Sequence, residues 1–132
     1  MKKFNKKKLP SRHTTIGADK APQRSFYYAM DLTEKDVAKP FVGVVSTWNE
    51  AAPCNINLMK QAQSVKKGVQ ATGGTPREFC TITVTDGIAM GHEGMKSSLI
   101  SRDVIADSTE LTVRGHCYDA LVGVAGCDKS LP

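Results

Sequence analysis

The sequence predicts an α/β fold with a parallel sheet built from strand–helix repeats. Three short runs rich in apolar or β-branched residues (41–45, 79–84 and 120–125) alternate with two amphipathic stretches (58–73 and 97–115). This alternation is typical of parallel strands joined by crossover helices. Such connections are right-handed in nearly all proteins. The chain has 132 residues, 40% of them hydrophobic and 23% charged, which is typical of one globular domain at most.

Residues 1–39 lack a sustained hydrophobic period, and we expect them to form an extended basic N-terminal arm. The arm accounts for the net charge of +5, because its first twelve positions contain six basic residues and no acidic one: Lys2, Lys3, Lys6, Lys7, Lys8 and Arg12. Such a terminus is usually solvated and poorly ordered, so we expect one short helix here, near residues 24–30. No interleaved aromatic residues support stacking on bases, and no nucleic-acid partner is predicted.

The chain carries no signal for membrane insertion or export. No apolar run approaches the roughly 18 residues that span a bilayer. The lysine-rich start is not followed by the apolar segment of a signal peptide. We therefore expect a cytoplasmic protein without a membrane partner.

The hydrophobic pattern changes at Pro40, and we expect residues 40–132 to form an α/β domain. The continuous apolar run 41–45 is typical of a strand that is buried on both faces. Apolar residues then recur every three or four positions from Leu58 to Val69, which predicts a helix of about 16 residues that begins near Asn55. Two glycines, 73–74, end this helix.

The second half of the domain repeats this order. Residues 79–84 are rich in β-branched side chains and are followed by Asp86 and a glycine, which predicts a strand and a turn. A glycine-rich loop leads to a second predicted helix over 97–115. The third apolar run, 120–125, predicts the last strand.

Chemically reactive side chains follow each predicted strand. Cys54 comes after the first strand, Asp86 after the second, and Cys127, Asp128 and Lys129 after the third. Because ligands of open parallel sheets bind beyond the carboxyl ends of the strands, we expect these loops to meet at one edge. The sequence therefore predicts a site that combines soft thiolates with hard oxygen ligands.

The residue types indicate two kinds of metal chemistry. A helix N-terminus near Cys54 would lower its thiol pKa, and two convergent thiolates without further zinc ligands favour iron–sulfur ligation over zinc. Asp86 and Asp128 are either ordinary turn residues or the oxygen ligands that magnesium prefers. Lys129 is a surface lysine, a counter-ion, a nucleophile or, as a carbamate, another oxygen ligand.

The other two cysteines are expected to be inert. Cys80 falls inside the second predicted strand, and Cys117 falls at the end of the second predicted helix. Cysteines in such places are usually buried side chains that act as small hydrophobic residues. We therefore predict no ligand role for Cys80 or Cys117.

Five separate motifs resemble one enzyme family, and they occur in the family's order. They are PCN at 53–55, TDG at 85–87, GHEGM at 91–95, SRDVIAD at 101–107 and GCDKSLP at 126–132. These motifs are similar to those of the dihydroxy-acid dehydratase family, which includes 6-phosphogluconate and aldonic-acid dehydratases. The resemblance runs from about Ser11 to Pro132.

The resemblance implies roles for the five site residues. Cys54 and Cys127 would ligate a 2Fe-2S cluster, Asp86 and Asp128 would bind Mg²⁺, and a carbamylated Lys129 would complete the magnesium side. The family removes water from a small 2,3-dihydroxy acid to give a 2-keto acid in valine and isoleucine biosynthesis, and its members are typically homodimers.

The resemblance also implies that the chain is an N-terminal fragment. Family members continue for several hundred residues and include a third cluster cysteine, a further acidic ligand and a serine base. We therefore expect residues 40–132 to be an incomplete N-terminal dehydratase domain, without turnover of its own. The alternatives are a sugar-acid dehydratase acting on aldonate or 6-phosphogluconate, and a non-catalytic metal-binding remnant.

Overall fold

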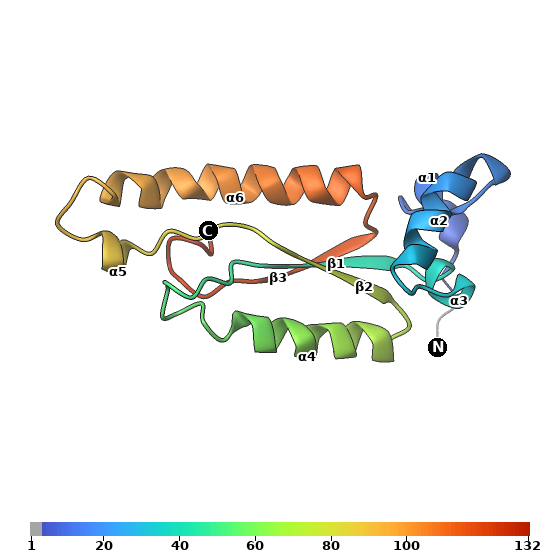
Figure 1. Ribbon diagram of the computed structural model, residues 1–132, viewed down its shortest axis with the longest axis horizontal. Coiled ribbons are helices and arrows are strands. Elements are labelled where there is room, and N and C mark those ends of the chain that lie inside the picture. The colour runs from blue at the N-terminus through green and yellow to red at the C-terminus, as the bar shows by residue number, and fades with distance from the viewer. Residues whose placement is uncertain (1–3) are drawn as a thin grey trace.

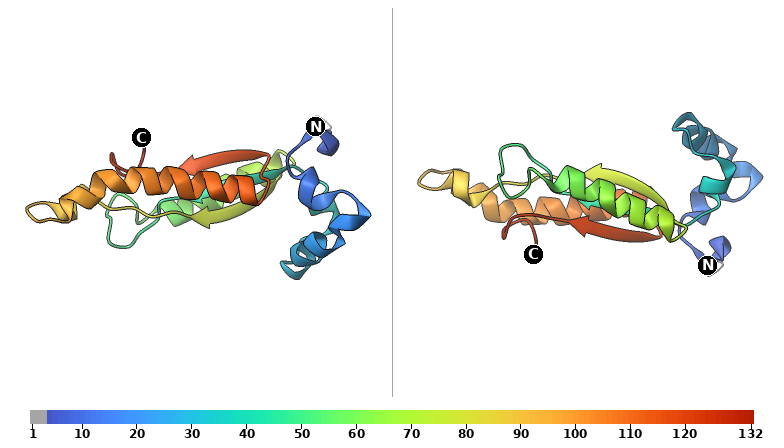
Figure 2. Two further views of the ribbon diagram at one scale, coloured as in Figure 1. Left: turned by 90° about the horizontal axis from the view of Figure 1, so that it is seen from above. Right: turned by 90° about the horizontal axis from the view of Figure 1, so that it is seen from below.

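The computed structural model describes residues 4–132, which form a three-stranded sheet with helices on both faces (Figure 1). Strands β1 (Phe41–Ser46), β2 (Thr75–Cys80) and β3 (Ala120–Val124) lie in the order β2-β1-β3, and both pairs are parallel. Helix α4 (Leu58–Ala71) covers one face, and α6 (Met95–Gly115) covers the other (Figure 2). The predicted α/β fold with a parallel sheet is confirmed.

The central strand β1 forms the core of the sheet. Phe41 and Val44 are fully buried, as expected for a continuous apolar run with helices on both sides. At Gly43 an added Cβ would lie 2.7 Å from the ring of Tyr118, so glycine allows this ring to pack against the strand. The prediction for residues 41–45 is confirmed, with one further residue, Ser46, at the carboxyl end.

Strand β2 is displaced from its prediction over residues 79–84. It begins at Thr75, whose amide donates to the Pro40 carbonyl at 2.8 Å. The polar residues Arg77 and Glu78 interrupt the apolar pattern from which a strand would be predicted. An edge strand tolerates such residues because one of its sides faces solvent. Glu78 forms a 2.8 Å ion pair with Lys66 of α4. The β-branched segment that was predicted as the strand continues beyond the sheet towards α5 (Asp86–Ala89).

The remaining elements of the domain follow the predicted order. Helix α4 begins at Leu58 rather than near Asn55, because residues 53–57 form turns. Helix α6 contains the whole predicted range 97–115, and β3 lies within the third apolar run. No helix within residues 4–132 is both long and apolar enough to span a bilayer.

The arm is more ordered than predicted. It contains two 3₁₀ turns and three short helices in place of one helix: η1 (Lys6–Lys8), α1 (Arg12–Thr15), η2 (Ala18–Lys20), α2 (Ala21–Ala29) and α3 (Glu34–Val37). Most are too short to show a hydrophobic period. Side-chain caps stabilise two of them: Asn5 caps η1, and a capping box between Thr33 and Asp36 begins α3. Lys2 and Lys3 of the predicted basic terminus lie outside the described residues.

A buried carboxylate, Asp119, joins the arm to the sheet. Its oxygens accept hydrogen bonds from the amide and hydroxyl of Ser11 at 2.8 and 2.5 Å, and from the amide of Phe41 at 2.7 Å. The Lys6 ammonium lies 4.0 Å away, over the ring of Phe41. These contacts join residues on the two sides of the domain boundary predicted between residues 39 and 40. That boundary stays a prediction.

Replacing Asp119 with alanine is expected to destabilise the fold by about 3 kcal/mol, since buried donors to a charged group lose their acceptor. The side chain of Asp119 is only 2% exposed, so water cannot substitute for the carboxylate. The change in free energy of unfolding measures the effect. The matched control is Asp19→Ala, because the Asp19 side chain is 71% exposed and its ion pair contributes little. Equal stability of the two variants would contradict this assignment.

Stability is expected to rise with pH through the titration of Lys6. Burial lowers the pKa of Lys6 from 10.5 to about 8, and the Asp119 carboxylate opposes this shift only in part. Between these two values the unfolded chain binds the proton and the folded chain does not, so raising the pH favours the folded state. Urea unfolding across this window should show the rise in wild type and in the exposed-site control Lys7→Met, and should lack it in Lys6→Met.

Candidate metal centre

The predicted loops meet at the carboxyl end of the sheet. They line a cavity of about 420 Å³, to which the loop after β1 contributes Cys54, the segment after β2 contributes Thr85 and Asp86, and the loop after β3 contributes Cys127 and Asp128. Parallel strands bring these loops together because all three strands point towards this edge.

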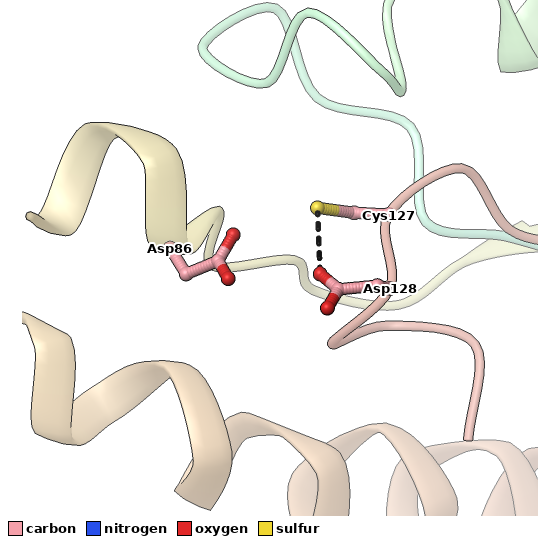
Figure 3. Close-up of side chains that lie close together, drawn as sticks. All are labelled: Asp86, Cys127 and Asp128. Carbon is pink, nitrogen blue, oxygen red and sulfur yellow. Dashed lines mark hydrogen bonds between the residues drawn. The ribbon is translucent and has the colours of Figure 1, made fainter.

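Three of the predicted ligands form one compact group. One ligand atom each from Asp86, Cys127 and Asp128 lies within 4.8 Å of the others. Figure 3 shows that the three side chains point into the same space, between α5 and the loop that follows β3. Cys127 is buried and its sulfur lies 4.0 Å from Oδ1 of Asp128, whereas the side chain of Asp128 is 70% exposed. The group therefore faces both the protein interior and the open cavity.

Cys54 also lines this cavity and completes the thiol pair. Its thiol pKa is raised, chiefly by the negative charge of Cys127, then by a hydrogen bond with Cys127 and by desolvation, with a smaller effect from Asp86. The predicted lowering of this pKa is wrong, because α4 begins only at Leu58 and the groups nearest to Cys54 are acidic. Thiolates and carboxylates that repel each other in this way favour a cationic centre between them.

Lys129 lies beside the acidic group. Its ammonium is 3.4 Å from Oδ2 of Asp128, and its backbone carbonyl accepts a 3.3 Å hydrogen bond from Arg102 of α6. The lysine is thus a counter-ion of Asp128 in this structure. Lys129 is not among the residues that line the cavity, so its role as a ligand stays a prediction.

A close backbone contact brings the two cysteine loops together. A Cβ added to Gly126 would lie 2.2 Å from the Cys54 carbonyl and 2.9 Å from Oδ1 of Asn55, so only glycine permits this approach. Asn55 is buried, and its amide donates to the backbone carbonyl of Thr47 at 2.5 Å and to the Thr47 hydroxyl at 2.7 Å. Within residues 4–132 its Oδ1 has no hydrogen-bond partner.

Replacing Gly126 with alanine is expected to weaken the site by separating the two cysteine loops. Moving a backbone carbonyl away from the new Cβ should cost about 1–3 kcal/mol, as overpacking does in protein cores. The free energy of unfolding and the iron retained by the purified full-length protein measure this effect. Gly68→Ala is the control, because a Cβ at this position in α4 meets no atom within 4 Å. Wild-type stability and iron content in Gly126→Ala would contradict the prediction.

The other two cysteines lie outside the cavity, but neither is buried as predicted. Cys80 is exposed because the displaced strand β2 places it at the last position of an edge strand. Cys117 is partly exposed and has a φ of 53° just after α6. Sequence reasoning assigned no role to Thr85, whose hydroxyl lies 3.8 Å from the sulfur of Cys127. The feature of the sequence that could have identified Thr85 is its position directly before Asp86.

The donor set fits the two groups that the resemblance implies. Cysteine sulfurs are the usual ligands of iron–sulfur clusters, and both cysteines line the cavity. Carboxylates are the usual ligands of Mg²⁺, and one oxygen each of Asp86 and Asp128 lies within 4.8 Å of the other and of the Cys127 sulfur. The residues therefore provide part of a ligand shell for each group.

Comparisons with known proteins show the family of the chain. The family model described as dihydroxy-acid/6-phosphogluconate dehydratase N-terminal matches residues 39–132. A protein of Pelagibacter ubique named dihydroxy-acid dehydratase is 90% identical over 132 residues, which are 100% of this chain and 23% of the relative. The protein of the same name from Parvibaculum lavamentivorans is 78% identical over 131 residues, covering 99% of this chain and 23% of the relative.

Proteins of lower identity also match this chain. The dihydroxy-acid dehydratase of Metallosphaera sedula is 56% identical over 116 residues, which are 88% of this chain and 21% of that protein. The chain thus spans less than a quarter of the length of these relatives. It belongs to the dihydroxy-acid/6-phosphogluconate dehydratase family and corresponds to the family's N-terminal part.

Proposed function

We propose that the full-length protein is a hydro-lyase that removes water from a 2,3-dihydroxy acid to give a 2-keto acid in branched-chain amino-acid biosynthesis. The observation that carries the proposal is the convergence of two thiols and two carboxylates on one cavity at the carboxyl edge of the sheet. Support also comes from relatives that bear the name dihydroxy-acid dehydratase. The proposal includes a homodimer in the cytoplasm that acts on a small molecule.

The five predicted residues divide into a soft and a hard half-site. Cys54 and Cys127 would hold a 2Fe-2S cluster, and Asp86, Asp128 and Lys129 would hold Mg²⁺. When bound, these groups would supply the Lewis acidity that favours loss of the C3 hydroxyl and of the proton on C2.

The residues of this chain contribute position and charge. Asp86 begins α5 and Asp128 lies in the loop after β3, so the two carboxylates reach the cavity from different elements. The deprotonated amine of Lys129 would attack carbon dioxide and lose a proton to solvent, which forms a carbamate and replaces a positive charge with a negative one. A magnesium site would gain a third anionic oxygen ligand from this step.

An assay of the full-length protein on three acids tests the proposal. We expect turnover of 2,3-dihydroxyisovalerate to the 2-keto acid, with little or none of arabinonate or 6-phosphogluconate. Preference for either sugar acid would make the protein a sugar-acid dehydratase of the same family. Inactivity on all three, in protein loaded with iron, sulfide and magnesium, would contradict the proposal and favour a non-catalytic metal-binding role.

A further inference from the structure

The Thr85 hydroxyl is directed at the sulfur of Cys127. The two atoms are 3.8 Å apart, and this is the one hydrogen bond that the Thr85 side chain makes within residues 4–132. Thr85 is the N-cap residue of α5, where a threonine hydroxyl commonly accepts from a helix amide, yet its side chain makes no such bond. The hydroxyl is therefore free to donate to the sulfur.

A second hydroxyl contact fixes this geometry. Thr83, two positions earlier, shares a 2.5 Å hydrogen bond with Ser130, three positions after Cys127, and both side chains are buried. The segment 83–85 and the loop 127–130 are thus joined at two points. The hydrogen bond between Thr83 and Ser130 helps to hold Thr85 beside Cys127. Neither Thr83 nor Ser130 lines the cavity.

The neighbours of Cys127 leave Thr85 as the hydrogen-bond donor to its thiolate. Two other polar groups lie near this sulfur: Oδ1 of Asp128, at 4.0 Å, and the thiol of Cys54. An ionised carboxylate can only accept, and Cys54 as a cluster ligand would itself have lost its proton. A ligating cysteine has lost its proton, so the hydrogen bond can run only from the threonine hydroxyl to the sulfur. Hydrogen bonds to ligating sulfurs stabilise the more negative, reduced form of an iron–sulfur cluster.

We propose that Thr85 is a positioning residue that donates a hydrogen bond to the Cys127 thiolate and thereby raises the reduction potential of the cluster. This inference rests on the proposed function, because it requires Cys127 to be a cluster ligand. Thr85 itself ligates no metal in this account. Its effect on the reacting centre passes through the sulfur, as expected for a residue that supports a ligand from outside the coordination sphere.

The test is a spectroelectrochemical titration of the purified full-length protein with its cluster bound. Thr85→Val keeps the shape of the side chain without the hydroxyl, and its potential should be lower than that of wild type. Thr85→Ser restores the hydroxyl and should return the potential to near the wild-type value. Thr81→Val is the matched control, because the Thr81 hydroxyl bonds Ser108 of α6 at 2.7 Å, and this variant should keep the wild-type potential.

The outcomes separate this inference from the function on which it rests. Equal potentials in wild type and Thr85→Val would overturn the role of Thr85 alone, and so would a Thr85→Ser potential as low as that of Thr85→Val. Wild-type protein that binds no iron or sulfide would overturn the cluster assignment together with this inference. If Thr85→Val does not retain its cluster, Thr85→Ala provides the same comparison with a smaller side chain.

Discussion

Replacing Cys127 with serine is expected to bleach the visible absorption of the full-length protein and to abolish its dehydratase activity. Cys127 is the buried member of the thiol pair, so solvent cannot easily supply a replacement ligand at that position. A serine hydroxyl is a hard oxygen ligand and is far less acidic than a thiol, and iron–sulfur clusters depend on thiolate ligation. Iron and sulfide content, measured with the absorption spectrum, gives the result.

Cys80→Ser is the control for the Cys127 variant. Cys80 lies on the same sheet, is exposed, and stands outside the cavity, so its replacement should leave the cluster and the activity unchanged. Normal iron content in Cys127→Ser would contradict the assignment of Cys127 as a ligand. Loss of the cluster in both variants would indicate general sensitivity of the fold instead of ligation.

Replacing Lys129 with arginine is expected to abolish turnover and to leave the cluster spectrum intact. The guanidinium keeps the positive charge beside Asp128, where the lysine ammonium now lies at 3.4 Å, but it stays protonated and does not form a carbamate. The magnesium side would lose one oxygen ligand, whereas Cys54 and Cys127 are unaffected. Activity and iron content measured on the same preparation separate these two effects.

Lys96→Arg provides the comparison for this second variant. The Lys96 side chain is 75% exposed at the start of α6, and its ion pair with Glu93 survives the change. The control should retain wild-type activity. Substantial turnover by Lys129→Arg would show that neither a carbamate nor a neutral amine at position 129 takes part in the reaction.

The sequence predicts the central elements of the fold because their patterns are unambiguous. Strand β1 is a continuous apolar run, and α6 has both the length and the spacing of a helix. Strand β2 escaped prediction because an edge strand can carry polar residues such as Arg77 and Glu78, whereas the β-branched segment after it looks more like a strand. The pairing of Thr75 with Phe41 sets the true register, and a local pattern does not contain that information.

The candidate site also has one part that the sequence predicts and another part that it does not. Its five ligand candidates could be predicted because each follows a predicted strand and carries a recognisable chemical group. The supporting contacts could not, because they join residues that are far apart in the sequence: Gly126 against the Cys54 carbonyl, and Thr85 against Cys127. The pKa of Cys54 was also mispredicted, since its largest influence is the charge of Cys127, a residue of another loop.

The contact between Ser11 and Asp119 has a consequence for the order of folding. It spans 108 positions of the chain, so it closes the longest loop among the side-chain hydrogen bonds of residues 4–132. Closing a long loop is entropically unfavourable until other contacts have shortened it, and pairing of β1 with β3 places Asp119 next to Phe41. During synthesis Ser11 emerges from the ribosome more than a hundred residues before its anchor, Asp119. The arm is therefore expected to reach its final place only after the sheet that follows it has formed.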